Sequence, residues 1–372
     1  MIYLDSAATT FRKPPAVAAA MQRALKTMSS PGRGGYESAR AAEELLFRCR
    51  SLAAELFHVD GAERAVFTSS ATHGLNIAIR SLVPPGGRAV ISGYEHNAVT
   101  RTLHALGAET VVAASPLFDA PGCSEAFRTA LRQGADAVIC TQASNVFGFI
   151  LPLREIAALC RERGVPLIVD AAQSAGVLPL DMAALGAAFV AMPGHKGLYG
   201  PQGTGLLLCG AEPEPLLLGG TGSESLRQEM PDFLPDRLEP GTHNVPGIAG
   251  LEAGLRFVRQ TGTGRILRHE RALIRRAAEG LRSVDGVTVY AAAEEENQLG
   301  VLSFTAADRE PEELARRLAD RGVAVRAGYH CAPLAHRTAG TPEQGTVRLS
   351  VSAFNRAEEI DRFLRVLRSV VK

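Results

Sequence analysis

The sequence predicts an α/β protein with a mostly parallel, seven-stranded sheet and a smaller α+β lobe toward the C-terminus. Short apolar runs alternate with amphipathic segments from about residue 60 to 210, as in parallel sheets covered by helices on both faces. A Pro/Gly-rich stretch, 210–247, then interrupts the alternation. Because 372 residues exceed the roughly 250–300 that one core usually supports, we expect two domains, 13–250 and 1–12 with 251–372.

Seven apolar runs are the strand candidates of the large lobe, and their Val, Ile and Leu content favours buried strands. In chain order they are AVFTSS (65–70), RAVISG (88–93), ETVVAA (109–114), AVICTQ (137–142), PLIVDAA (166–172), AAFVAM (187–192) and TGLLLC (204–209). Ligands of such sheets bind beyond the carboxyl ends of the strands. Polar residues directly after these runs are therefore the candidates for chemistry.

The helices follow from apolar spacing. Residues 153–163 place apolar side chains on one face and end at Gly164, with Pro166 just beyond, which is a normal helix stop. Two long helical patterns cover about 248–260 and 264–283. The smaller lobe is expected to contain a strand near 299–305, a helix near 311–322, strands near 323–327 and 346–351, and a helix from about 356.

Composition excludes several function classes. The net charge is +1, aromatic residues make up 5% and tryptophan is absent, so nothing favours nucleic acid or an anionic membrane as a partner. The N-terminus lacks the features of a signal peptide, and no apolar run reaches membrane-span length. We therefore expect a cytoplasmic location. The six cysteines show no CxxC or metal-ligand spacing, so we expect no metal site, no disulfides and mostly buried thiols.

Two strand ends carry an acid and a lysine. Asp170 ends the run PLIVDAA, and Lys196 lies in the glycine-rich stretch MPGHKGLYGPQGTG (192–205). Alone, Asp170 is equally typical of a helix N-cap, and Lys196 of a surface hairpin. With Gln173 beside the acid, they indicate a pyridoxal phosphate site, where the lysine amine bonds to the cofactor aldehyde and the aspartate pairs with the pyridinium nitrogen. The glycines leave room for a close cofactor, and a desolvated pocket lowers the pKa of the amine.

Three further strand ends complete the predicted site. TSSATHGLN opens a helix in which Ala71 and Thr72 would offer amides and a hydroxyl to the phosphate; an ordinary small polar turn is the alternative. YEHNAV contains His96, which could stack on the cofactor ring or be an ordinary core histidine. SNVFG contains Asn145, which is placed for the ring hydroxyl or the substrate unless it only forms a tight turn at Gly148.

The order of the motifs YLDSAATT, SSATHGLN, EHNAV, SNVFG, DAAQSAG, GHKGLYGPQGTG and EPGTHN resembles that of class V, fold-type I pyridoxal phosphate enzymes, and among them the cysteine desulfurase and selenocysteine lyase group. The resemblance covers nearly the whole chain. It implies a homodimer with active sites at the subunit interface, in which Gly241 and Thr242 reach the phosphate of the neighbouring subunit's cofactor. It also implies that His195 contacts the phosphate and that Ala7 contacts the substrate.

The C-terminal lobe narrows the resemblance to the short-loop branch of the desulfurases. RAGYHCAPLAH contains Cys331 and TVRLSVSAFN contains Arg348. In that branch such a cysteine attacks the substrate sulfur, and such an arginine holds the substrate carboxylate. Cys331 stands beside His330 and near Arg326, in polar surroundings that favour a thiolate. A packed thiol in a turn and a surface ion pair are the structural alternatives.

We therefore expect a cysteine desulfurase in which Lys196, His96 and Cys331 are catalytic. It would convert L-cysteine to L-alanine and pass a persulfide from Cys331 to an acceptor protein or small thiol, for iron–sulfur cluster assembly, thio-cofactors or tRNA thiolation. A selenocysteine lyase and a class V aminotransferase stay open as alternatives. A non-catalytic dimer is disfavoured by the combination of acid, lysine and arginine. Pro193 and Tyr329 stand where the desulfurases often have serine and histidine, which leaves the sulfur acceptor open.

Overall fold

The computed structural model describes residues 1–32, 34–307, 309–341 and 343–371. The helices are α1 (Pro15–Thr27), α2 (Glu37–Phe57), α3 (Ala71–Leu82), α4 (Asn97–Ala105), α5 (Ala120–Ala130), α6 (Leu153–Arg163), α7 (Met182–Leu185), α8 (Val245–Thr261), α9 (Thr263–Arg282), α10 (Pro311–Ala319), α11 (Pro333–Ala339) and α12 (Ala357–Val371). The strands are β1 (Ile2–Tyr3), β2 (Ala65–Thr68), β3 (Arg88–Ser92), β4 (Glu109–Ala113), β5 (Ala137–Thr141), β6 (Leu167–Asp170), β7 (Phe189–Pro193), β8 (Gly205–Cys209), β9 (Val287–Tyr290), β10 (Val301–Ala306), β11 (Val323–Ala324), β12 (Arg326–Gly328) and β13 (Thr346–Ser350).

The seven expected strands of the large lobe form one sheet, in the order β2-β8-β7-β6-β5-β3-β4. Strand β8 runs antiparallel to both of its neighbours, and the other pairs are parallel. The prediction of a mostly parallel seven-stranded sheet is confirmed. Because β2 runs in the same direction as the parallel strands, five strand ends that carry polar motifs meet at one edge.

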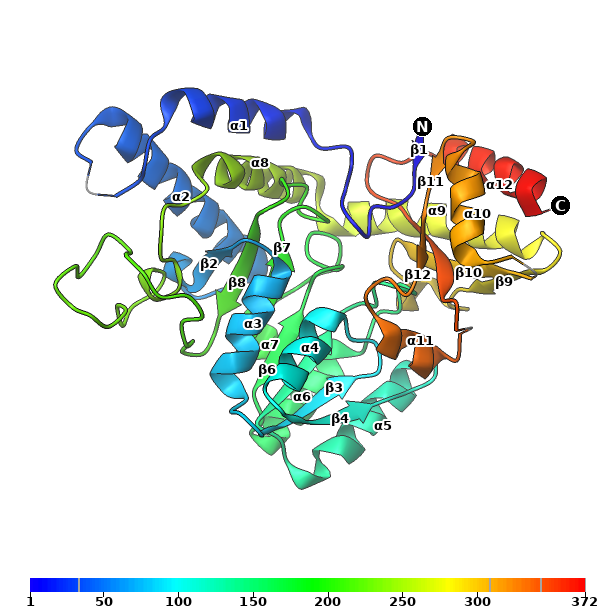
Figure 1. Ribbon diagram of the computed structural model, residues 1–372, viewed down its shortest axis with the longest axis horizontal. Helices are drawn as coiled ribbons and strands as arrows, with labels where there is room; N and C mark the ends of the chain where they lie inside the picture. Colours follow the sequence, from blue (N-terminus) through cyan, green and yellow to red (C-terminus); the bar gives the residue numbers. More distant parts are fainter. Residues whose placement is uncertain (33, 308, 342, 372) are drawn as a thin grey trace.

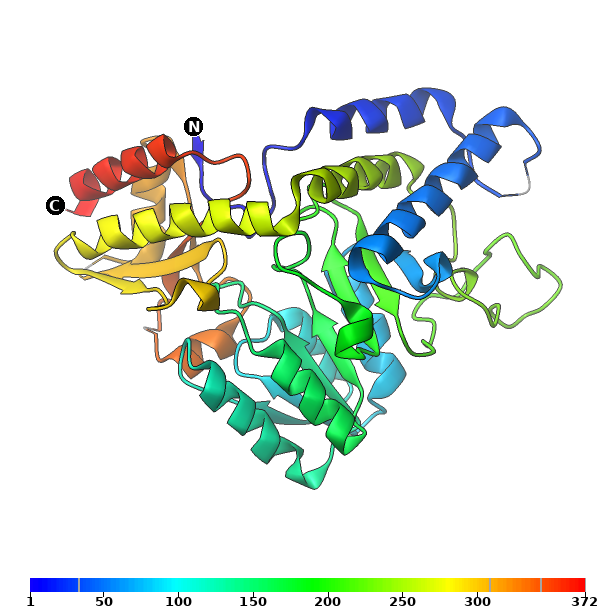
Figure 2. The ribbon, with the colours of Figure 1, turned by 180° about the vertical axis from the view of Figure 1, so that it is seen from behind.

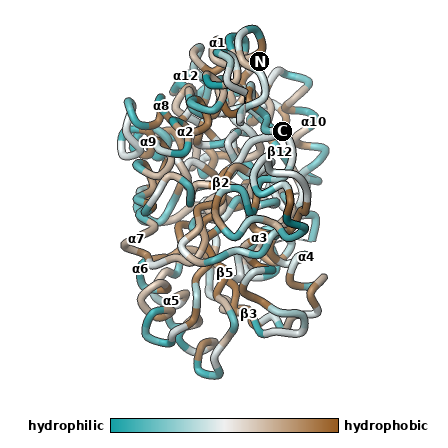
Figure 3. Tube along the Cα trace, turned by 90° about the vertical axis from the view of Figure 1, so that its left-hand side faces the viewer, coloured by the Kyte–Doolittle hydropathy of each residue, from teal (hydrophilic) through white to brown (hydrophobic). Residues whose placement is uncertain are grey.

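Both faces of this sheet are covered. In β6, Leu167 and Val169 belong to the core that includes α5 and α6, whereas Ile168 belongs to the core that includes α3 and α4, as the alternation of side chains along a strand requires. Helices α3 and α4 lie on one face (Figure 1), and α5, α6 and α7 lie on the other (Figure 2). Seen from the side, the sheet with β3 and β5 lies between these two layers (Figure 3).

The smaller lobe is an antiparallel sheet in the order β12-β13-β10-β9, packed against α9, α10 and α12. Its expected strands and helices are present, with two corrections. The single strand expected over 323–327 is two strands, because the chain at Val325 leaves β11, which pairs with β1, and joins the four-stranded sheet as β12. Strand β9 was not predicted, because its half-exposed residues give a weak pattern.

The N-terminal residues lie against the C-terminal lobe. Strand β1 pairs in parallel with β11, and Asp5 forms a bridge to Ser350, which Figure 1 shows as the blue chain beside the orange strands. The boundary expected at residue 250 falls inside α8, and the division into domains stays a prediction. Over the described residues, no helix is long and apolar enough to cross a membrane, and no three His, Cys, Asp or Glu side chains are grouped to hold a metal ion.

The connection from β8 to α8 has only one short 3-10 helix, Asp236–Leu238. It exposes several large apolar side chains, among them Leu217, Leu218 and Leu226. Its far end is firmly attached, because Glu239 is buried and forms an ion pair with Arg50.

Candidate active site

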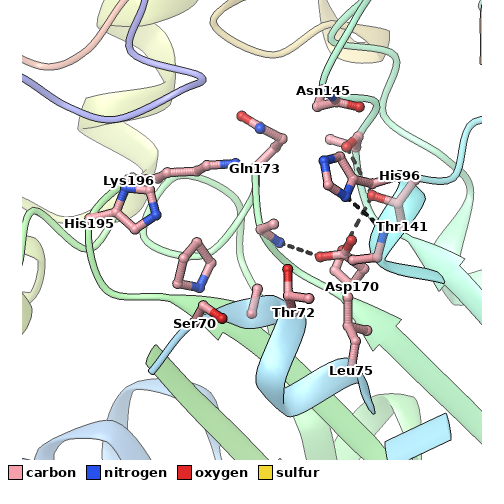
Figure 4. A pocket seen from close by; sticks show the side chains of 15 residues that line it. Ser70, Thr72, Leu75, His96, Thr141, Asn145, Asp170, Gln173, His195 and Lys196 are labelled. Carbon is pink, nitrogen blue, oxygen red and sulfur yellow. Dashed lines mark hydrogen bonds between the residues drawn. The ribbon is translucent and has the colours of Figure 1, made fainter. Parts of the chain in front are cut away.

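A cavity of about 100 Å³ lies at the sheet edge where the polar motifs converge. It brings together most of the residues expected to bind a cofactor. They are Ala71, Thr72, His96, Asn145, Asp170, Gln173, His195 and Lys196 (Figure 4). Ala7, Arg348 and Cys331 do not line this cavity, and Gly241 and Thr242 line a different one.

Lys196 lies in a short segment after β7 in which close packing leaves no room for a side chain at Gly194 or Gly197. A Cβ atom at Gly197 would lie 2.3 Å from the Ala175 carbonyl oxygen, and one at Gly194 would lie 2.2 Å from Thr204 Oγ1. Burial, and then the charge of Arg348, lowers the pKa of Lys196 to about 8. About a tenth of the amine is therefore uncharged and nucleophilic at pH 7, far more than for an exposed lysine. The surface-hairpin alternative for Lys196 is wrong.

Asp170 ends β6 on the floor of the same cavity. One carboxylate oxygen accepts a hydrogen bond of 2.9 Å from the Ala172 N–H, and no described residue donates to the other. Burial raises the pKa of Asp170, while the Ala172 hydrogen bond and Lys196 lower it. A turn and not a helix follows Asp170, so the N-cap alternative is wrong as well.

The amino end of α3 opens into the cavity. Ser70 is the N-cap, and its Oγ accepts a hydrogen bond of 3.2 Å from the His73 N–H. The first N–H groups of the helix, at Ala71 and Thr72, have no partner within the helix and favour an anion. Across from them, His195 carries a buried Nδ1 without a hydrogen-bond partner. These donors fit a phosphate group, and together with Lys196 and Asp170 they match pyridoxal phosphate.

His96 is the N-cap of α4, and its ring is neutral. Its Nδ1 accepts a hydrogen bond of 3.0 Å from the Ala98 N–H, so the ring proton lies on Nε2. Burial, followed by the charges of Lys196 and Arg101, lowers the pKa of His96 to about 4. A neutral ring fixed in this way can stack on a flat cofactor. The hydrogen bond from the Ala98 N–H makes His96 the N-cap of α4 and also fixes the orientation of its ring.

Asn145 connects the cavity to the smaller lobe. Its Nδ2 donates to the His330 carbonyl oxygen at 2.7 Å, and its own carbonyl accepts from Arg348 Nη1 at 3.0 Å. The Cys331 carbonyl in turn accepts from the Asn97 N–H at 2.8 Å. These hydrogen bonds hold the turn that carries Cys331 at the rim of the cavity.

Cys331 is exposed, and the other five cysteines are buried. His330 and Cys331 have φ angles of 51° and 57°, which are uncommon for residues other than glycine. Burial lowers the pKa of His330 well below its ordinary value, so this histidine is neutral and adds no positive charge beside the thiol. Arg326 interacts electrostatically with Cys331 and supplies the nearby cation.

Arg348 is 2% exposed, and the surface-ion-pair alternative is wrong. Its Nη2 donates to Asp5 Oδ1 at 2.9 Å, and Arg326 Nη2 lies 2.9 Å from Asp5 Oδ2. The Nε atom of Arg348 is buried without a partner. One aspartate between two guanidinium groups leaves one positive charge uncompensated, and a substrate carboxylate could neutralise it.

Sequence reasoning missed the N-terminal residues that hold the lysine segment. Thr10 and Lys13 both hydrogen bond to the His195 carbonyl oxygen, at 3.0 Å through the Thr10 hydroxyl and at 2.9 Å through the Lys13 amine. Gln173 Nε2 donates to the Ala7 carbonyl at 3.1 Å. The available signal was the run YLDSAATT, whose polar residues directly follow a short strand.

Gly241 and Thr242 line a different cavity, of about 440 Å³, with Ser69, His73 and Gly203. Gly241 has a φ of 90°, and its N–H donates to the Gly220 carbonyl. Within one chain they are not brought to Lys196, and their predicted contact with a neighbouring subunit stays a prediction.

The chain is similar to known proteins over nearly its whole length. A family model described as "Aminotransferase class-V" matches residues 2–363. A probable cysteine desulfurase of Methanothermobacter thermautotrophicus is 32% identical over an alignment of 371 positions that covers 96% of this chain and 92% of the relative. A probable cysteine desulfurase of Pyrococcus abyssi is 30% identical over an alignment of 384 positions, gaps included, that covers 100% of this chain and 94% of the relative. The solved apo structure of a cysteine desulfurase from Thermococcus onnurineus has a TM-score of 0.89 at 30% identity and covers 100% of this chain and 94% of the other.

Proposed function

This chain belongs to the class V aminotransferase family, and on that premise we propose that it is a pyridoxal-phosphate-dependent cysteine desulfurase. The observation that carries the proposal is the joining of two lobes at one site. Lys196 and Asp170 line a cavity at the sheet edge, while hydrogen bonds from Asn145 and Asn97 hold the Cys331 turn at its rim. An aminotransferase has no need of an exposed thiol there.

The cofactor would be held by residues with distinct tasks. Ala71, Thr72 and His195 would bind its phosphate, Asp170 its pyridinium nitrogen, and the neutral ring of His96 its face. When bound, pyridoxal phosphate supplies an electron sink for carbanion chemistry at the substrate α-carbon. Arg348, with its unpartnered Nε, would bind the carboxylate of L-cysteine and so place the α-carbon near Lys196.

Lys196 and Cys331 would then carry out proton transfer and sulfur transfer, respectively. The Lys196 amine takes the α-proton, because its lowered pKa leaves it uncharged in part near neutral pH. The thiolate of Cys331 attacks the substrate sulfur, so that an S–S bond forms and the substrate C–S bond breaks. The electron pair of that bond stays with the β-carbon, which takes up a proton, and Lys196 returns its proton to the α-carbon, so that the product is L-alanine. Cys331 keeps the sulfur as a persulfide for an acceptor thiol.

We further propose that the active unit is a cytoplasmic homodimer that serves an acceptor protein or small thiol, with iron–sulfur cluster assembly among its uses. The exposed leucines of the connection before α8 support a partner surface there. Gly241 and Thr242 would reach the neighbouring subunit's cofactor phosphate from the same connection.

The test is to incubate the cofactor-loaded protein with L-cysteine and a thiol reductant, and to quantify alanine and sulfide. Cys331→Ala should release little of either product, whereas Cys160→Ala, at a buried thiol, should keep native rates. Equal sulfide release from native protein and Cys331→Ala would contradict the persulfide step. If L-selenocysteine were also the better substrate, the protein would be a selenocysteine lyase instead. Transfer of the amino group to a keto acid would favour an aminotransferase.

A further inference from the structure

A second and smaller cavity lies directly behind Lys196. Its volume is about 30 Å³, and Lys196 and Gln173 line both this rear cavity and the cofactor cavity. Glu270 of α9 and Ser6 of the N-terminal segment also line the rear cavity. Lys196 therefore borders two cavities, and the second one contains a carboxyl and a hydroxyl group.

Glu270 is a buried acid that the catalytic scheme above does not use. It is 4% exposed, and burial alone raises the pKa of its carboxyl to about 8. No described residue forms an ion pair or a hydrogen bond with this carboxyl. Gly300 leaves space for it, because a Cβ atom there would lie 2.4 Å from Glu270 Oε2. A buried carboxyl without any partner is costly, so the rear cavity must supply one.

Two other polar groups at this cavity have unused hydrogen-bonding capacity among the described residues. Ser6 Oγ is buried and makes no hydrogen bond. The Tyr199 hydroxyl accepts a hydrogen bond of 3.0 Å from the Ala353 N–H, but no described residue accepts its proton. A buried water needs about 10–15 Å³ and two to four polar partners. The rear cavity offers room for one or two waters, with Glu270, Ser6 and Tyr199 as the partners.

We propose that the rear cavity holds ordered water bound by Glu270, Ser6 and Tyr199, and that this assembly stores and exchanges a proton with Lys196. The role of the lysine in this statement rests on the proposed function. The titratable groups that line the cavity besides Glu270 are Tyr199 and Lys196. Proton transfer through the water converts the neutral acid and the amine into a carboxylate and an ammonium, so protons and total charge are conserved.

The placement gives Lys196 a proton route that does not cross the substrate. In each turnover the lysine takes a proton and must later return to the amine. With cofactor and substrate bound, the cofactor cavity would be occupied, which would restrict proton exchange with bulk water on that side. Glu270 can accept or return the proton from the rear without touching substrate or cofactor. It is thus a positioning and proton-storing residue.

The first experiment observes the proton on Glu270 directly in the cofactor-loaded, full-length protein. Infrared spectra of a neutral carboxylic acid show a C=O band that shifts in D₂O. Native protein at pH 7 should show this band, and Glu270→Gln should lose a component that titrates near pH 8 in the native protein. Glu95→Gln is the matched control, because Glu95 is a second fully buried carboxyl with a pKa raised to about 8. An identical band in native protein and Glu270→Gln would overturn the proposal.

The second experiment tests for the water without removing the acid. If the cavity is hydrated, Ser6→Ala loses a hydrogen-bonded hydroxyl, and the urea midpoint should fall. If the cavity is dry, Ser6→Ala removes a hydroxyl that has no partner, and the midpoint should rise. A rise would overturn the proposal, as would a crystal structure that shows the cavity without water.

The third experiment tests the link to Lys196. Glu270→Gln should lower kcat for alanine release by at least about tenfold, the low end of proton-transfer effects, with KM for L-cysteine unchanged. It should also alter the alkaline limb of the kcat–pH profile. An unchanged kcat and profile would overturn the link. Because the infrared band and the midpoint do not depend on desulfurase activity, failure of the proposed function would not change them.

Discussion

Replacing the catalytic lysine should make the cofactor-free protein more stable. Burial lowers the pKa of Lys196 from 10.5 to about 8, so the unfolded chain binds a proton more tightly than the native state does. At pH 7 this difference costs the native state about 3 kcal/mol. Because part of the Lys196 side chain contacts solvent in the cavity, we expect Lys196→Met to raise the free energy of unfolding at pH 7 by about 2–3 kcal/mol. Lys196→Met removes the charge and keeps much of the apolar length, and the amine forms no hydrogen bond with a described residue that would be lost.

The stability difference between native protein and Lys196→Met should decrease as the pH rises. The lysine penalty is fully present below pH 8, declines between pH 8 and 10.5 as the unfolded chain alone stays protonated, and is absent above that. Urea unfolding of cofactor-free native protein and Lys196→Met should therefore differ by about 2–3 kcal/mol at pH 7 and by only about 1–1.5 kcal/mol at pH 9.5.

Lys13→Met is the matched control. The pKa of Lys13 is also lowered to about 8 by burial, but its amine donates to the His195 carbonyl and to Thr10 Oγ1, at 2.9 and 2.6 Å. Loss of these hydrogen bonds should make Lys13→Met destabilising. A Lys196→Met variant that is less stable than the native protein at pH 7, or whose advantage grows with pH, would refute the reasoning.

Three further outcomes are expected. Arg348→Gln should raise KM for L-cysteine by about 10–150-fold, since hydrogen bonds to charged groups contribute about 1.5–3 kcal/mol; steady-state kinetics would contradict this if KM stayed native. Glu239→Gln leaves Arg50 buried without its counter-charge, and urea unfolding should show a loss of about 3–5 kcal/mol, whereas Glu212→Gln at an exposed pair should be near neutral. A thiol-reactive dye should label one cysteine quickly in the native protein, because only Cys331 is exposed; fast labelling of Cys49 or Cys140, detected by mass spectrometry, would show that these thiols are not buried.

The large sheet and the centre of the site could be predicted because their signals are local. Each buried strand is a continuous apolar run, and Asp170 and Lys196 directly follow two of them. Asp5 could not be found this way, since its partner Arg348 lies 343 residues away. Glu270 is hidden among many charged residues of the 264–283 pattern, and only the packing of α9 shows that it is buried. No glycine or proline separates Val323 from Ala327, so no turn residue marks the change of sheet at Val325.

The attachment of the first residues to the last lobe has a consequence for biosynthesis. Strand β1 has no strand to pair with until Val323 and Ala324 have been made, and Asp5 must wait for residues 326 and 348 to neutralise it. On the ribosome, where the N-terminal part is free to fold first, the opening segment stays undocked until translation is nearly finished.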